Sequence, residues 1–251
     1  MIMGLLVTVV TILVTGVLLW VARRLIPGDT KQDHHDVIIA VHQMVGMLYA
    51  ILLAFVVIIV WETASKADDD SQVEANKVSQ IYFTARDLPE PQRGQLTGLA
   101  KQYATTVVDE EWPLMAQGET SAKARALVGK MRTTAHDLRP ASAHDEILMD
   151  QTLTAINELV EARRARTDAV ESKIPPIMWA GLIVGAALTV GITFVYDYTR
   201  YVPHFLMVSA MTLLTVFLLW LTWEMSQPFD GPTGVGPDAF ATIRDRFAEF
   251  P

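Results

Sequence analysis

The chain has 251 residues and a formal net charge of −8 at pH 7, and 51% of its residues are hydrophobic. The acidic balance argues against nucleic acid as a partner, because phosphate backbones select basic surfaces. The absence of cysteine excludes disulfides, thiolate metal sites and cysteine nucleophiles.

Four long segments contain no Asp, Glu, Lys or Arg, and each can cross the hydrocarbon core of a bilayer, which is about 30 Å thick. The longest covers residues 37–61. As a helix rising about 1.5 Å per residue, it would measure about 37 Å. The others cover residues 1–22, 174–196 and 201–223. We therefore expect an all-α membrane protein with four transmembrane helices.

The second of these segments carries a regular spacing of small residues. Gly46, Ala50 and Ala54 recur every four residues, which lets helix backbones approach closely in lipid. We expect this span to be the most enclosed, packed against other helices or against copies of itself. Copies around a symmetry axis would surround a pore. The residues predicted to line it are His42, Gly46, Tyr49, Leu53 and Val57.

Residues 62–173 are polar and are expected to form a soluble helical bundle, inserted between the second and third spans. The segment has no alternating strand pattern, and its prolines and glycines divide it into helical stretches. Its first and last helices are expected to extend spans two and three. The predicted organisation is a first transmembrane pair over 1–61, the helical domain over 62–173, a second pair over 174–224 and a tail over 225–251.

Carboxylates gather where spans leave the membrane on the domain side. Glu62 follows the second span, Glu224 follows the fourth, and Asp69 lies about two helical turns beyond Glu62. In a symmetric oligomer each would repeat as a ring, giving a vestibule that concentrates cations. The domain holds 19 acids against 14 lysines and arginines. The alternative is a solvated acidic helix face with ordinary interfacial glutamates.

Two further groups of charged or titratable residues stand out. His34, His35 and His204 fall in or beside the short loops opposite the domain. Together they could bind a divalent cation or sense pH; the alternative is that they are scattered loop residues. In the domain, Arg163, Arg164 and Arg166 are expected to pair with acids of neighbouring helices. Binding of a ligand is the alternative for these arginines.

Four spans would place both termini and the domain on one side of the membrane. Arg23, Arg24, Lys31 and Arg200 lie in the short loops on the other side. Because the positive-inside rule gives short loops the most weight, this count slightly favours a domain that faces outward.

The spans contain no acid, lysine or arginine in their interior. Coupled transporters place such groups in the membrane, so a coupled transporter is not expected. A passive channel with a hydrophobic constriction needs none, and neither does a non-conducting scaffold or signalling protein that acts through its domain. No nucleotide-binding, zinc-peptidase or nucleophile-elbow motif occurs, so we expect neither an enzyme nor a cofactor.

A set of motifs over nearly the whole chain resembles a bacterial family of four-span membrane proteins catalogued as bestrophin-like. One motif is residues 49–56 with Trp61 and Glu62. The other residues that carry the resemblance are Tyr103, Glu111, Trp112, Arg163, Arg166, Pro176, Trp179, Pro228, Phe229 and Gly231.

Bestrophins are pentameric chloride channels gated by calcium, with a pore lined by span two and the domain in the cytosol. The resemblance implies a homo-oligomer in a bacterial inner membrane, with a pentamer favoured, that passes inorganic ions. The resemblance also implies that the domain faces the cytosol, whereas the count of positive charges in the short loops favours a domain that faces outward. This chain departs from the bestrophins in two respects. Its tail has only scattered acids, at Asp230, Asp238 and Asp245, and the carboxylates where the spans leave the membrane suit cations. We predict a passive channel with cation preference; a non-conducting scaffold is the alternative.

Overall fold

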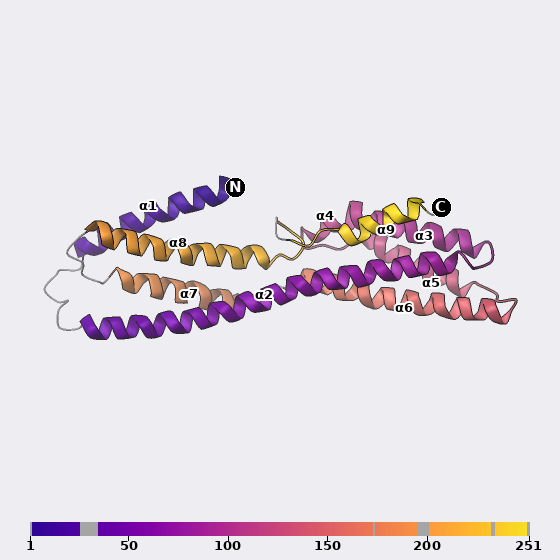
Figure 1. Cartoon of the computed structure of the whole chain (residues 1–251), viewed down its shortest axis with the longest axis horizontal. Helices are drawn as coiled ribbons and strands as arrows, with labels where there is room; N and C mark the ends of the chain where they lie inside the picture. Colours follow the sequence, from indigo (N-terminus) through magenta and orange to yellow (C-terminus); the bar gives the residue numbers. More distant parts are fainter. Residues whose placement is uncertain (1, 26–34, 173, 195–200, 232–233, 250–251) are drawn as a thin grey trace. The chain divides into compact units, whose positions relative to one another are not determined.

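The computed structural model describes residues 2–25, 35–172, 174–194, 201–231 and 234–249 (Figure 1). The all-α prediction is confirmed for these residues, which form helices and contain no strand. The chain forms two compact units. We call Met1–Val60 with Ile174–Trp223 the membrane unit, and Trp61–Lys173 with Glu224–Pro251 the helical unit.

The membrane unit contains α1 (Ile2–Leu25), the first half of α2 (His35–Ala85), α7 (Pro176–Thr193) and most of α8 (Tyr201–Met225). Helices are expected of apolar segments in lipid, because backbone N–H and C=O groups must be paired within the segment. Among the described residues, three helices are long and apolar enough to cross a membrane, at Val37–Ala85, Pro176–Thr193 and Val202–Met225. A fourth span at α1 stays a prediction.

Helices α2 and α7 pack through glycines. A Cβ at Gly185 of α7 would lie 2.6 Å from Cδ2 of Tyr49 on α2, so only glycine leaves room for the ring. About one turn away, a Cβ at Gly46 would lie 4.0 Å from Cγ2 of Thr189. The glycine-bearing face of α7 therefore meets the side of α2 that carries Gly46 and Tyr49, whereas Ala50 and Ala54 of the predicted small-residue spacing are exposed.

The helical unit has one apolar core. It combines the second half of α2 with α3 (Gln92–Thr106), the π-helical segment η2 (Val107–Glu111), α4 (Trp112–Met115), α5 (Ala122–His136), α6 (Ala143–Glu171) and α9 (Asp238–Glu249). The largest fully buried apolar side chains are Tyr82, Tyr103, Phe240, Phe247, Ile81, Leu88, Leu96, Met131, Leu138 and Ile156. Burial of these side chains is the main force that holds the unit together.

Local signals explain where the longer helices begin and end. Helix α6 starts at a capping box, in which Ser142 and Asp145 bond each other's backbone N–H groups. It ends at Glu171, and α7 starts separately at Pro176. Proline has no N–H to donate and is tolerated in a first turn, so the Pro175–Pro176 pair fixes this break. Helix α2, by contrast, has no such interruption and continues from one unit into the other.

The C-terminal tail is part of the helical unit's core. Phe240, Ile243 and Phe247 of α9 are buried, and the Phe247 ring stacks on Tyr82 with 4.1 Å between the centroids. Before α9, the Trp112 Nε1–H donates a hydrogen bond to the carbonyl of Val235 at 2.9 Å. The tail is therefore fixed by aromatic packing.

Candidate functional site

The predicted pore residues lie on the side of α2 that packs inside the membrane unit. Tyr49 and Leu53 are 8% and 7% exposed, while His42, Gly46 and Val57 are half-buried. A side chain that is enclosed by its own subunit can face an axial pore only if the packing around that side chain opens. Their role as pore-lining residues stays a prediction, and burial weighs against Tyr49 and Leu53.

The opposite side of α2 is apolar and exposed. Five side chains there are 45–69% exposed, and their spacing of three or four residues places them along one side of the helix. We call them the open face of α2: Met44, Met47, Ile51, Phe55 and Ile58. An apolar face of this kind is suited to lipid, to another subunit or to a hydrophobic constriction.

The predicted vestibule carboxylates have different surroundings. Glu62 and Asp69 are exposed on α2 just beyond the membrane unit. Glu224 is half-buried, and its carboxylate lies so close to Gly231 that a Cβ there would overlap it. Gly231 also has φ of 78°, a left-handed conformation that favours glycine. Glu224 therefore contacts the turn that begins the tail.

Aspartates on the same part of α2 repel one another. The pKa of Asp70 is raised above its ordinary value, chiefly by partial burial and also by the charges of Asp69 and Glu74. Lys66 opposes this shift and does not cancel it. The segment accordingly has a local excess of negative charge.

Two of the three histidines of the predicted metal site, His35 and His204, belong to the described residues. His34 lies outside these residues, and His35 is the first residue of α2. His204 is buried, with its Nε2 3.0 Å from the carbonyl oxygen of Thr193. No group of three or more His, Asp or Glu side chains in the described part could hold a metal ion. The predicted site stays untested, since His34 is not described.

A buried network of charged side chains connects four segments of the helical unit. Arg166 on α6 donates from Nε to Glu74 Oε2 on α2 at 2.6 Å, and from Nη2 to Glu111 Oε2 at the end of η2 at 2.8 Å. Arg163 holds Glu111 with two bonds, of 2.7 Å and 2.5 Å. Tyr103 of α3 donates its hydroxyl hydrogen to Glu74 and accepts from Arg163 at 3.0 Å.

The network is neutral in sum and enclosed on all sides. Glu74, Glu111 and Arg166 have no exposed side-chain surface, and Arg163 is 9% exposed. The Trp112 and Phe240 rings lie 5.2 Å and 5.4 Å from the Arg166 guanidinium, within cation–π range.

Burial and charge pairing shift the pKa values of Glu111 and Tyr103 in this network. Burial alone would raise the pKa of Glu111, but hydrogen bonds and charge from Arg163 and Arg166 lower the pKa below its ordinary range. Burial, with the negative charge of Glu74, raises the pKa of Tyr103 well above its ordinary value. Both carboxylates are paired and Tyr103 stays neutral, so the arrangement fixes structure and offers no general base.

The arginine prediction holds for two of three residues. Arg163 and Arg166 pair with acids of other segments, as expected. For Arg164 it is wrong, because among the described residues this exposed side chain pairs with Asp168 of its own helix, at 3.9 Å. The role of Glu74 as a partner of Arg166 was not predicted. Its position could have indicated burial, because it shares a helical face with the buried residues Ala67, Ser71, Val78 and Ile81.

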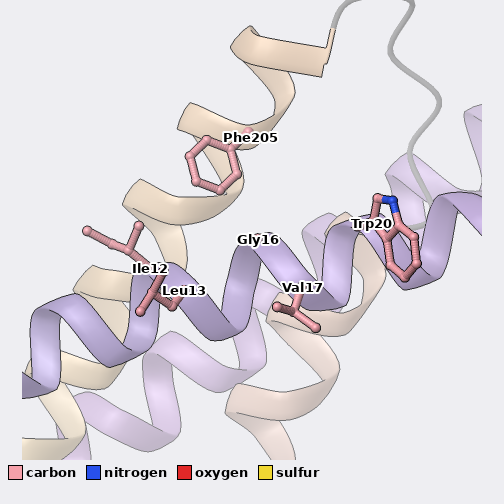
Figure 2. A pocket seen from close by; sticks show the side chains of 6 residues that line it. All are labelled: Ile12, Leu13, Gly16, Val17, Trp20 and Phe205. Carbon is pink, nitrogen blue, oxygen red and sulfur yellow. The ribbon is translucent and has the colours of Figure 1, made fainter.

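The membrane unit also has an open apolar groove of about 430 Å³ between α1 and α8. Figure 2 shows the side chains that line it: Ile12, Leu13, Gly16, Val17 and Trp20 of α1, with Phe205 of α8. A Cβ at Gly16 would lie 3.3 Å from Phe205 Cε2, so the glycine lets the two helices approach. The lining offers no titratable group for a substrate.

These features define an all-helical membrane protein with a separate helical unit. The family model described as Bestrophin-like domain matches residues 9–240, so the chain belongs to the bestrophin-like family. No curated protein matches the sequence.

Solved structures share the fold. A variant of a bacterial bestrophin homolog from Klebsiella pneumoniae is similar, with a TM-score of 0.72 and 13% identity over 96% of this chain and 97% of that one. A structure described as a membrane protein has a TM-score of 0.71 and 14% identity, with 96% of each chain covered. At these identities the likeness establishes the fold.

Proposed function

We propose that this protein is a homo-oligomeric passive ion channel with a pore lined by α2. The family and the shared fold support this proposal. In it, α1 is the fourth span, and both termini and the helical unit lie on one side of a bacterial inner membrane. The number of subunits that the resemblance favours is five.

The observation that carries the proposal is the open face of α2. Lipid would cover such a face on a single chain, but copies arranged around an axis would enclose it. Ile51, Phe55 and Ile58 would then form a hydrophobic constriction that gates by dewetting. The proposal uses this face because Tyr49 and Leu53 are already enclosed by their own subunit.

The proposed ion preference is for cations. Glu62 is four residues beyond Ile58, and Asp69 is seven residues beyond Glu62, so all three lie near one side of α2. Repeated around an axis, their carboxylates would form acidic rings at the mouth of the pore. Such rings raise the local concentration of cations. Glu224 is also included in this vestibule.

A non-conducting scaffold or signalling protein is the second candidate. The close packing of Tyr49 against Gly185 of α7 favours it, because this side of α2 is used within the chain. The scaffold would act through the helical unit and would need no pore.

The test is ion flux in liposomes reconstituted with the full-length protein, together with subunit count by mass photometry. Cation flux is expected, and Glu62→Gln should lower cation over anion selectivity. Asp150→Asn, at an exposed position of α6, is the control and should leave selectivity unchanged. A monomeric particle without flux under any ionic or pH condition would exclude the channel and leave the scaffold.

A further inference from the structure

The groove between α1 and α8 is apolar along its length and has an arginine at one end. Three of its large apolar side chains, Leu13, Val17 and Trp20 of α1, are 57–64% exposed. The Trp20 ring has a second contact, because the Arg24 guanidinium lies over it, 5.4 Å from the ring centroid. Trp20 therefore connects the apolar groove to a positive charge.

The close approach at Gly16 gives the groove its shape. The α1 backbone lies near the Phe205 ring at this glycine, and Figure 2 shows larger side chains of α1 on both sides of it. A hydrocarbon chain in such a hollow contacts protein atoms on two sides, so it gains more dispersion contacts than on the convex surface of a single helix. The groove volume of about 430 Å³ lies within the range of about 300–1,000 Å³ that small-molecule sites occupy.

The length of the groove is close to the thickness of one leaflet. Ile12 and Trp20 are eight residues apart on α1, or about 12 Å along its axis. Half of the hydrocarbon core measures about 15 Å. Residues 1–22 are uncharged, and Arg24 lies about 6 Å beyond Trp20. With α1 as a span, the guanidinium would therefore lie near the lipid headgroups, where tryptophan is also enriched.

Arginine is well suited to the phosphate of a lipid headgroup. Its planar guanidinium presents N–H donors that bind phosphate oxygens in pairs. Stacking on Trp20 uses the face of the guanidinium and leaves the donors at its edge for such bonds. Arg24 is exposed and the groove lining is uncharged, so this end of the groove is positive. A ligand with an apolar chain and an anionic head complements both parts.

We propose that the groove binds one acyl chain of an anionic phospholipid, whose phosphate is held by Arg24. The lining from Ile12 to Trp20, with Phe205, would contact the chain, and the guanidinium would contact the headgroup. This inference relies on α1 as a membrane span, which is part of the proposed topology. It does not rely on ion conduction, so a non-conducting scaffold would bind the same lipid.

The test measures quenching of Trp20 fluorescence by lipids with brominated chains. The full-length protein is reconstituted into phosphatidylcholine liposomes that contain rising fractions of brominated phosphatidylglycerol or brominated phosphatidylcholine. The difference in emission between the natural chain and Trp20→Phe isolates the signal of Trp20. Quenching should be half complete at about a fivefold lower fraction of the anionic lipid, the ratio that corresponds to about 1 kcal/mol for one arginine near anionic lipid.

A matched pair of substitutions separates charge from packing. Arg24→Gln and Arg24→Lys both remove the guanidinium from the Trp20 ring, but only Arg24→Lys keeps the positive charge. The fivefold preference should fall to near one in Arg24→Gln and should largely persist in Arg24→Lys. Lys66→Gln, which removes a positive charge at an exposed position of α2, is the control and should leave the preference unchanged.

Three results would overturn the proposal. Equal quenching by the two lipids would show an apolar surface that any lipid covers. Absence of quenching by either lipid would show that another copy of the chain covers the groove or that α1 lies outside the bilayer. Equal losses of preference in Arg24→Gln and Lys66→Gln would show attraction by overall charge. Ion flux through the same liposomes is recorded separately, so failure of the lipid site and failure of the channel are distinguishable.

Discussion

Arg166 of α6 and Glu74 of α2 form an ion pair inside the helical unit, with 2.6 Å between Nε and Oε2 and no exposed side-chain surface on either residue. The same guanidinium holds Glu111, so α6 is connected to α2 and to η2 by one side chain. Burial removes these charges from water, and the lost hydration free energy is offset only while every partner of each charge is present.

Removing Arg166 should therefore destabilise the protein strongly. Of the donors to Glu74 among the described residues, Arg166→Met leaves the Tyr103 hydroxyl, and it is expected to lower the free energy of unfolding by about 3–5 kcal/mol. Chemical denaturation in detergent measures this change. Arg164→Met alters an exposed arginine of the same helix and should have a small effect. Similar losses for the two variants would contradict an essential role for the network.

The pH dependence of stability should contain a contribution from Glu111. Its pKa is lowered in the folded protein from the ordinary value of 4.5, so the folded state favours the charged form. This contribution is present above 4.5 and is lost as the pH falls from there through the lowered pKa. Melting curves from neutral pH into acid should reveal the loss. Glu111→Gln should be less stable at neutral pH and should lose less on acidification; an unchanged acid dependence would disprove this assignment.

The contact between α2 and α7 should tolerate no added side chain at Gly185. Gly185→Ala would place a Cβ 2.6 Å from the Tyr49 ring, so the helices must separate, at a cost of about 1–3 kcal/mol. Gly191→Ala, in the same helix, meets nothing within 4 Å and should be neutral or stabilising, by up to about 1 kcal/mol. Thermal unfolding of the two variants compares them directly. Equal melting temperatures would mean that α2 and α7 do not pack in this way.

The sequence was sufficient to predict the helices but not every contact they make. An uncharged segment of 25 residues indicates a membrane-spanning helix, and prolines such as Pro175 and Pro176 mark where helices break. The positions of the helices could therefore be predicted. The small-residue spacing of Gly46, Ala50 and Ala54 predicted close packing; Gly46 faces Thr189, but Ala50 and Ala54 are exposed. It could not say which helix would be the partner, because α7 and a second copy of α2 satisfy the same pattern.

The candidate site was harder to predict for the same reason. Periodicity alone does not tell which side of an entirely apolar helix is enclosed, so the burial of Tyr49 and Leu53 could not be predicted. Pairing of Arg163 and Arg166 followed from their charge and position, whereas Glu74 depends on contacts 92 residues apart in sequence. Long-range contacts of this kind leave little local signal.

Accessible cysteines can determine which side of α2 lines the proposed pore. The natural chain has no cysteine, so Ile58→Cys and Leu53→Cys each introduce the sole thiol. A charged, membrane-impermeant thiol reagent reaches groups in an aqueous pore and not those that face lipid or lie inside the subunit. If the open face of α2 lines the pore, the reagent should reduce ion flux through Ile58→Cys and leave Leu53→Cys unaffected. The reverse result would place the pore on the side of Tyr49 and Leu53, and would require the packing between α2 and α7 to open during conduction.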